Sequence, residues 1–155
     1  MSKTNVIRIL ESQNLPHSST EYEFNEDEID AVSVARKIGV DEDTVFKTLV
    51  TEGDKTGINI FCIPAKYELN LKKAATASGN KKVEMIKMKE LLPLTGYIRG
   101  GCSPIGMKKL YPTFIDETAQ LFENIFISAG IRGMQVKLHP DDLRTLINGT
   151  YSDLI

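Results

Sequence analysis

The chain has 155 residues, with 19 basic and 21 acidic side chains and a formal net charge of −2. This length suits one domain with a substantial core, so we expect a single domain over residues 1–155. The charge balance excludes a strongly basic nucleic-acid-coating protein, and any RNA contact must come from a local patch. No apolar run approaches the roughly 20 residues of a membrane span, and no signal-peptide pattern opens the chain, which predicts a cytoplasmic protein without a membrane partner.

Hydrophobic periodicity and capping residues predict the elements in chain order. Helices are expected over 5–13 after Thr4, over 31–38 before Gly39, over 71–78 before Gly79, as a turn over 87–92, and from Pro140 onward with Leu143, Leu146 and Ile147 on its apolar face. Strands are expected over 17–24, 45–50, 58–63, 83–86, 113–116, 124–128 and 134–138, with a hairpin turn over 53–57. Many short strands with a few helices favour an α+β fold, with a compact, barrel-like mixed sheet and helices packed outside it.

Metal and nucleophile signatures are missing from the sequence. Cys62 and Cys102 are too few for a disulfide framework and lack metal-ligand spacing, so we predict free thiols. His17 and His139 each lie beside a proline and accompany no nucleophile motif. The acidic run over 23–30 is more typical of a solvated turn than of a metal site. We therefore expect no metal and no cofactor.

One lysine stands out in the strand predicted over 45–50. Alternation places Phe46, Thr48 and Val50 on one face and Val45, Lys47 and Leu49 on the other. Because both faces are mostly apolar, both are expected to be covered. Lys47 is then either a lysine that extends its ammonium into solvent, or a pocket lysine that awaits a phosphate or carboxylate.

A glycine-rich stretch runs from Thr95 to Gly106. Its apolar start leads into Gly100 and Gly101, which we expect at the end of a strand, and a small polar group and Pro104 follow. Glycines let the backbone approach a ligand, and successive free N–H groups can hold an anion or a developing oxyanion. The alternative is a plain connection between two strands.

Four lysines form a second basic feature around the end of the helix predicted over 71–78: Lys72, Lys73, Lys81 and Lys82. They are either a solvated surface or an edge that contacts the phosphates of a ligand.

Several stretches together, in order and at matching spacing from about residue 3 to the C-terminus, resemble the YbaK/EbsC family. They are Phe46-Lys47-Thr48-Leu49, Leu71-Lys72-Lys73-Ala74, residues 81–85, Thr95-Gly96-Tyr97, residues 100–106, Lys108-Lys109, residues 127–130, Arg132-Gly133 and the closing helix around Asp141 and Leu143. This family is similar to the editing domain inserted in bacterial prolyl-tRNA synthetases. Its best-known members are free-standing deacylases of Cys-tRNA(Pro). The resemblance implies a mostly antiparallel sheet wound around a small pocket.

The resemblance also implies roles for particular residues. Lys47 would anchor the tRNA 3′ end, and Gly100 and Gly101 would line the ester carbonyl. The other implied substrate-binding residues are Tyr22, Thr48 on the opposite strand face, Tyr97, Ser103, Pro104 and Ser128. Asp30-Ala31 stands where many relatives have Phe-Gly, and Gln135 where many have Asp, so both positions bear on amino acid specificity. Cys102 stands where relatives have an apolar residue, and we interpret it as a packing residue.

The implied reaction is an attack by the substrate's own cysteine thiol on its ester, which expels the tRNA 3′-hydroxyl. The implied partners are the tRNA 3′ acceptor end and prolyl-tRNA synthetase in a ternary complex. Three alternatives stay open: a deacylase for Ala-tRNA(Pro), a hydrolase that uses a bound water, and a non-catalytic module that binds a tRNA end, a nucleotide or a regulatory partner.

Overall fold

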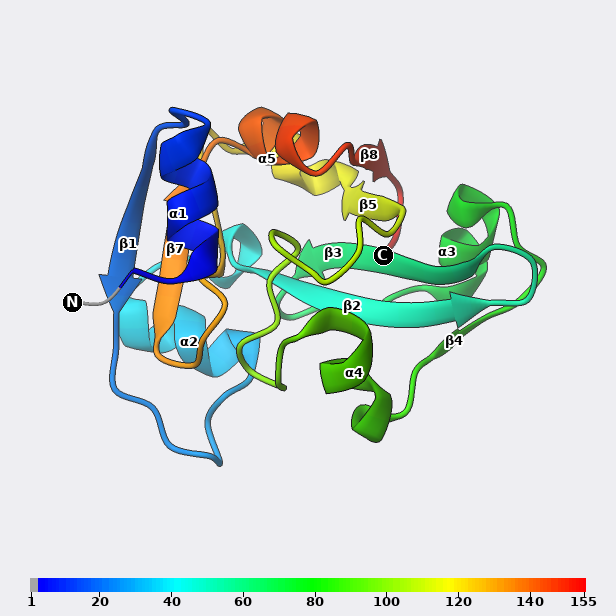
Figure 1. Ribbon diagram of the computed structural model, residues 1–155, viewed down its shortest axis with the longest axis horizontal. Coiled ribbons are helices and arrows are strands. Elements are labelled where there is room, and N and C mark those ends of the chain that lie inside the picture. The colour runs from blue at the N-terminus through cyan, green and yellow to red at the C-terminus, as the bar shows by residue number, and fades with distance from the viewer. Residues whose placement is uncertain (1–2) are drawn as a thin grey trace.

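The two longest strands of the fold form a hairpin, and the other elements are arranged around it (Figure 1). The computed structural model describes residues 3–155. Strand β2 (Phe46–Gly53) pairs antiparallel with β3 (Gly57–Pro64), and Phe46 lies opposite Pro64. Gly57 has a φ of +72°, a left-handed conformation that glycine adopts without steric strain, so the turn closes where the sequence predicted it.

The strands form two sheets. The larger has the order β4-β2-β3-β5-β8 and adds β4 (Val83–Met85), β5 (Thr113–Asp116) and β8 (Thr150–Ser152) to the hairpin. The smaller has the order β1-β7-β6 and contains β1 (His17–Glu21), β6 (Ile125–Ser128) and β7 (Met134–Leu138). Among the strand pairs of residues 3–155, only β3–β5 and β5–β8 are parallel. The prediction of a mixed, mostly antiparallel sheet is therefore confirmed, although both sheets are open and do not close into a barrel.

A parallel bridge between Val45 and Phe126 joins the two sheets. The main core lies where helix α1 (Asn5–Ser12) packs its Val6 and Leu10 among buried residues of β5, β6 and β7. A second core lies beneath helix α3 (Leu71–Ser78) and contains Phe61 and Ile63 of the hairpin. Phe46 of β2 belongs to the main core and Leu49 packs against the second, so core residues contact both faces of β2, as its alternation predicted.

The helices begin and end at the expected signals. Asp30 caps α2 (Ala31–Ile38) and Gly39 ends it with a φ of +74°. Asn70 caps α3, and His139 caps α5 (Pro140–Leu146). Short 3₁₀ turns complete the fold at η1 (Glu42–Thr44), η2 (Met88–Glu90) and η3 (Glu117–Leu121). Within residues 3–155, no helix is both long and apolar enough to cross a bilayer.

Two local expectations, for the end of the first strand and for the glycine pair, were wrong, one helical turn was longer than expected, and one strand was not foreseen. The first strand ends at Glu21, three residues early, and β8 was not foreseen. The turn expected over 87–92 is η2 followed by helix α4 (Leu91–Thr95). Gly96 ends α4 with a φ of +86°, and its N–H donates to the Leu92 carbonyl at 2.8 Å. The glycine pair therefore follows a helix and a turn, and not a strand.

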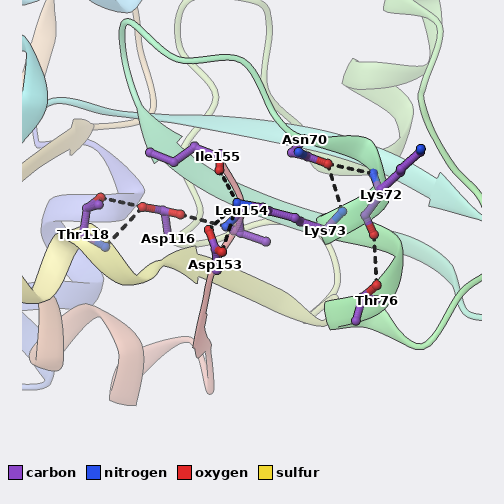
Figure 2. A network of polar contacts seen from close by, with 9 residues as sticks. All are labelled: Asn70, Lys72, Lys73, Thr76, Asp116, Thr118, Asp153, Leu154 and Ile155. Atoms are coloured by element: carbon purple, nitrogen blue, oxygen red, sulfur yellow. Dashed lines mark hydrogen bonds and ion pairs between the residues drawn. The ribbon is translucent and has the colours of Figure 1, made fainter.

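A network of hydrogen bonds and an ion pair holds the C-terminal residues 153–155 against the larger sheet and α3 (Figure 2). One carboxylate oxygen of the fully buried Asp116 accepts from the Leu154 N–H at 2.9 Å, and the other accepts from both the N–H and hydroxyl of Thr118. The Lys73 ammonium donates to the Asp153 carboxylate at 3.0 Å and to the Ile155 carbonyl at 2.6 Å. These bonds hold the buried Leu154 against the second core.

We expect Asp116→Ala to lower the free energy of unfolding by about 3 kcal/mol, because buried N–H and hydroxyl groups lose a charged acceptor. Asp153→Ala is the matched control, because it removes only an exposed ion pair worth under about 1 kcal/mol. Urea denaturation of both variants measures the difference. Equal losses in the two variants would contradict the anchoring role of Asp116.

Candidate functional site

A pocket of about 380 Å³ opens at the start of β2, within the size range of small-molecule sites. It lies between α2, the chain that follows α4, and the ends of β6 and β7. Its lining residues are Ile29, Asp30, Ala31, Val34, Val45, Phe46, Lys47, Thr48, Leu49, Ala65, Arg99, Gly100, Cys102, Ser128 and Gln135. Six of the eleven residues predicted for the site therefore meet in one cavity: Asp30, Lys47, Thr48, Gly100, Ser128 and Gln135.

The pocket coincides with an interruption in strand pairing along β2. On the side away from β3, β2 pairs with β4 only over Thr51–Gly53 and is bridged to Phe126 at Val45. Between these points, no strand of the described chain pairs with residues 47–49 on that side. An unpaired strand edge presents polar backbone groups. The pocket thus forms where a further strand would otherwise lie.

Lys47 is partly buried and holds the pocket's central positive charge. Burial lowers the pKa of its ammonium, and the carboxylates of Glu68 and Asp30 oppose this effect. No carboxylate within residues 3–155 comes within 4.0 Å of the ammonium. An anion bound beside Lys47 would offset the unfavourable desolvation. This environment favours the pocket-lysine interpretation over a lysine extended into solvent.

The glycine pair allows its segment to pack closely against two others. At Gly100, where φ is +87°, an added Cβ would lie 2.9 Å from the Cβ of Ile29. At Gly101 it would lie 3.1 Å from the backbone of Ile131. The Gly101 N–H donates to the Ile98 carbonyl at 3.0 Å, so this N–H is already used. The Gly101 N–H is therefore not free to bind a ligand, and of the two glycines Gly100 alone lines the pocket.

Ser128 and Gln135 face each other across the β6–β7 pair and line the inner end of the pocket. The Ser128 hydroxyl accepts from the Gly130 N–H at 3.1 Å. Gln135 is 5% exposed, and its side-chain oxygen is buried without a hydrogen-bond partner. Buried acceptors are nearly always satisfied. The Gln135 oxygen is therefore an unpaired acceptor among the residues that line the pocket.

Cys102 and Thr48 occupy positions that do not suit a nucleophile. Burial raises the pKa of the Cys102 thiol to about 12, so it stays protonated at neutral pH. This supports the packing interpretation. The Thr48 hydroxyl lies 3.9 Å from the sulfur of Cys62, on the strand face opposite Lys47. Burial also raises the pKa of Cys62 to about 12.

Asp30 reaches the pocket rim with both oxygens already engaged. They accept from the N–H and the hydroxyl of Ser33 at 3.1 and 2.6 Å, which caps α2. The hydroxyl bond is the main cause that lowers the pKa of Asp30. The negative charge of Asp30 still acts on Lys47, where it raises the pKa of the ammonium and so opposes the effect of burial.

The remaining predicted residues lie outside the lining. The Tyr97 hydroxyl donates to the Ile105 carbonyl, and the buried Ser103 hydroxyl accepts from the Ile105 N–H at 3.3 Å. Pro104 borders a separate cavity, and Tyr22 borders a shallow depression beside Lys37. The bonds of Tyr97 and Ser103 hold the loop at Ile105, while a direct contact of these four residues with substrate stays a prediction.

Sequence reasoning missed several lining residues, of which Arg99 is the most informative. It directly precedes Gly100 and adds a second cation at the pocket rim. Its position beside the glycine pair was the available signal. Ala65 and Ile29 gave no signal, because they reach the pocket only through the packing of distant segments.

A family model described as the aminoacyl-tRNA editing domain matches residues 26–146, which contain every residue of this lining. The chain belongs to this family. A relative from Enterococcus faecalis (strain ATCC 700802 / V583), named "Putative Cys-tRNA(Pro)/Cys-tRNA(Cys) deacylase EbsC", is 50% identical over 152 residues. That match covers 98% of this chain and 93% of the relative. The resemblance to the YbaK/EbsC family is therefore confirmed.

Solved structures share the fold of this editing domain. One, described as "a putative trans-editing enzyme for prolyl tRNA synthetase", has a TM-score of 0.82 and 24% identity over 99% of this chain and 98% of its own. Another, the hypothetical protein APE2540, has a TM-score of 0.88 and 19% identity over 97% and 99% of the two chains. At these identities the likeness concerns the fold alone.

The unsatisfied oxygen of Gln135 leads to a stability prediction. Gln135→Met keeps the side-chain length and removes the buried acceptor, so the free energy of unfolding should rise by about 1–2 kcal/mol. Ser128→Ala, which removes a satisfied acceptor, should lower it by about 1 kcal/mol. Urea denaturation measures both changes. A loss of stability in Gln135→Met would show that its oxygen is satisfied in the free protein.

Proposed function

We propose that this editing domain acts as a free-standing deacylase that removes cysteine from mischarged tRNA(Pro). The observation that carries the proposal is a pocket with a partly buried lysine that has no ion-pair partner within residues 3–155, and with no histidine or thiolate in its lining. Within residues 3–155, neither histidine lines the pocket, and the one lining thiol, Cys102, is protonated. The name of the relative from Enterococcus faecalis adds support for this substrate.

A cysteinyl ester brings the nucleophile that the pocket lacks. The substrate sulfur attacks the ester carbonyl carbon, the bond from that carbon to the ribose 3′-oxygen breaks, and the thiol proton passes to the departing oxygen. The product is a four-membered cyclic thioester, which water opens to free cysteine. A thiol suits this step because its pKa of about 8.5 leaves some thiolate at neutral pH, whereas a hydroxyl leaves almost none.

The protein then acts by holding and polarising its substrate. Lys47 anchors the 3′-terminal nucleotide through its phosphate, and the backbone beside Gly100 lies where negative charge develops on the carbonyl oxygen. Fixing the sulfur near the carbonyl can remove about 7–11 kcal/mol of the barrier in favourable cases. A preorganised N–H donor can contribute about 3–4 kcal/mol more.

The unsatisfied oxygen of Gln135 supplies a contact for the aminoacyl group. An amide oxygen accepts from the α-ammonium or the thiol of the substrate, but it carries no charge, unlike the Asp of many relatives. The partner under this proposal is the tRNA 3′ end in the cytoplasm, and a ternary complex with prolyl-tRNA synthetase stays a prediction. The competing specificity is Ala-tRNA(Pro), which a water-using mechanism would cleave.

The test measures amino acid release from preformed Cys-tRNA(Pro) and Ala-tRNA(Pro) with the native chain and with Lys47→Ala. We expect release of cysteine only, with kcat/KM about 100-fold lower in Lys47→Ala, because the variant loses a charge-assisted contact in a desolvated pocket. Lys72→Ala is the control, since Lys72 is exposed and belongs to α3, away from the pocket.

Three outcomes would change the proposal. Release of alanine at a similar rate would replace the thiol mechanism by water attack. Equal activity of Lys47→Ala and Lys72→Ala would remove Lys47 from the site. Binding of tRNA without release of either amino acid would leave the non-catalytic module.

A further inference from the structure

The basic side chains of the protein are unevenly distributed, and one segment beside the pocket holds an excess. Residues 87–109 contain a single acidic residue, Glu90. The same segment carries five cationic residues, which we call the basic rim: Lys87, Lys89, Arg99, Lys108 and Lys109. Five cations against one acid give the segment a net charge of +4, in a chain whose total is −2.

The charges of the basic rim are not neutralised within the described chain. All five side chains are exposed, and none forms an ion pair with a carboxylate of residues 3–155. Glu90 uses its carboxylate to accept from the Lys87 backbone N–H at 3.0 Å. The lone acid of the segment therefore serves its own helical turn, and the cations face solvent.

The other basic cluster, which the sequence offered as a phosphate-contacting edge, is different. Lys73 is bound to Asp153 and to the Ile155 carbonyl, and Lys82 pairs with Glu84 at 2.9 Å. Asp54 accepts from the backbone at Lys81 and Lys82, beside the far end of the hairpin. That end of β2 is Gly53, six residues after Lys47, so the two residues are about 20 Å apart at the usual rise of a strand. This geometry favours the solvated-surface interpretation for that cluster.

The basic rim, by contrast, borders the pocket at one of its residues, Arg99. In Figure 1 the chain after α4 runs toward α2 before it turns back to β5. Arg99 is both a rim residue and part of the pocket lining. The Arg132 Nε donates to the Arg99 carbonyl at 2.8 Å and brings a further cation to the same edge. The Lys108 N–H donates to the Thr95 carbonyl at 3.2 Å, which places Lys108 beside the end of α4.

Exposed apolar side chains lie between these cations. Met88, Leu92 and Ile98 all belong to the same segment and are about half exposed or more. Such a mixture of cations and apolar side chains can bind phosphates while it covers sugar and base surfaces.

We propose that the basic rim binds the phosphates of the tRNA acceptor stem behind the 3′ end that enters the pocket. The inference rests on the proposed function, which places the terminal nucleotide at Lys47. In this proposal the preceding nucleotides leave the pocket along the edge where Arg99 and Arg132 lie, and the other cations of the basic rim follow in the same chain segment. Each phosphate contact releases a counterion, so the rim must make binding dependent on salt.

The test compares two variants of equal charge. The rim variant is Lys89→Gln/Lys108→Gln/Lys109→Gln, and the control is Lys55→Gln/Lys72→Gln/Lys81→Gln, three exposed lysines at the other end of the hairpin and on α3. Kd for an uncharged acceptor-stem RNA hairpin that ends in CCA is measured over a range of salt concentrations. The rim variant should lower the slope of log Kd against log salt by about 2–3 and weaken binding at low salt at least tenfold, and the control should change neither.

Each other outcome overturns the proposal. Equal slopes in the two variants would show that the rim contacts no phosphates, and a larger effect in the control would move the RNA to the α3 side. An unchanged slope with lost binding to prolyl-tRNA synthetase would make the rim a protein-docking surface. The RNA hairpin used in this test carries no amino acid. A failure of the protein to release cysteine from Cys-tRNA(Pro) would therefore overturn the proposed function without affecting this result.

Discussion

An interruption in backbone pairing is the constraint on which the site depends. β2 is held by β3 along one side for its whole length. On its other side, within residues 3–155, it is held at Val50, whose carbonyl accepts from the Ile86 N–H, and at Thr51–Gly53, while Val45 just before it is bridged to Phe126. The free edge between them includes Lys47, whose side chain cannot leave the pocket lining without breaking the alternation of the strand. The hairpin register therefore fixes a cation at the edge where a ligand can reach polar backbone groups.

The other segments that line the pocket pack closely around this edge of β2. The left-handed φ at Gly100 lets the loop after α4 approach Ile29, and the absence of a Cβ at Gly101 lets it approach Ile131. Capping by Asp30 draws a carboxylate toward Lys47 without an ion pair, which would neutralise the lysine. The result is a positive, partly desolvated pocket that binds and orients an ester, whose own thiol performs the attack under the proposed function.

Much of the fold followed from local signals in the sequence. The hairpin, the caps at Thr4, Gly39 and Gly79, and the strands over 113–116 and 134–138 lie where they were predicted, because each depends on its own residues. β8 was missed, because its three residues become a strand only by pairing with β5. Sheet order and the Val45–Phe126 bridge depend equally on tertiary contacts.

The pocket lining was predictable where a residue differed in chemical type from its neighbours in the sequence. Lys47 in an apolar strand and a glycine pair after an apolar run both pointed to the pocket. Tyr97 and Ser103 could not be separated from lining residues, because their inward hydrogen bonds to Ile105 appear only in three dimensions. The unsatisfied oxygen of Gln135 was likewise invisible, since it depends on which donors packing leaves nearby.

Under the proposed function the substrate supplies the nucleophile, so removing the thiol from the substrate should abolish fast release. Single-turnover release is followed from Cys-tRNA(Pro) and from 2-aminobutyryl-tRNA(Pro), whose ethyl side chain nearly matches cysteine in size but carries no thiol. We expect release of cysteine at least about 100-fold faster, because only cysteine can attack its own ester. Equal rates would contradict it and would show that the pocket selects by size and activates water.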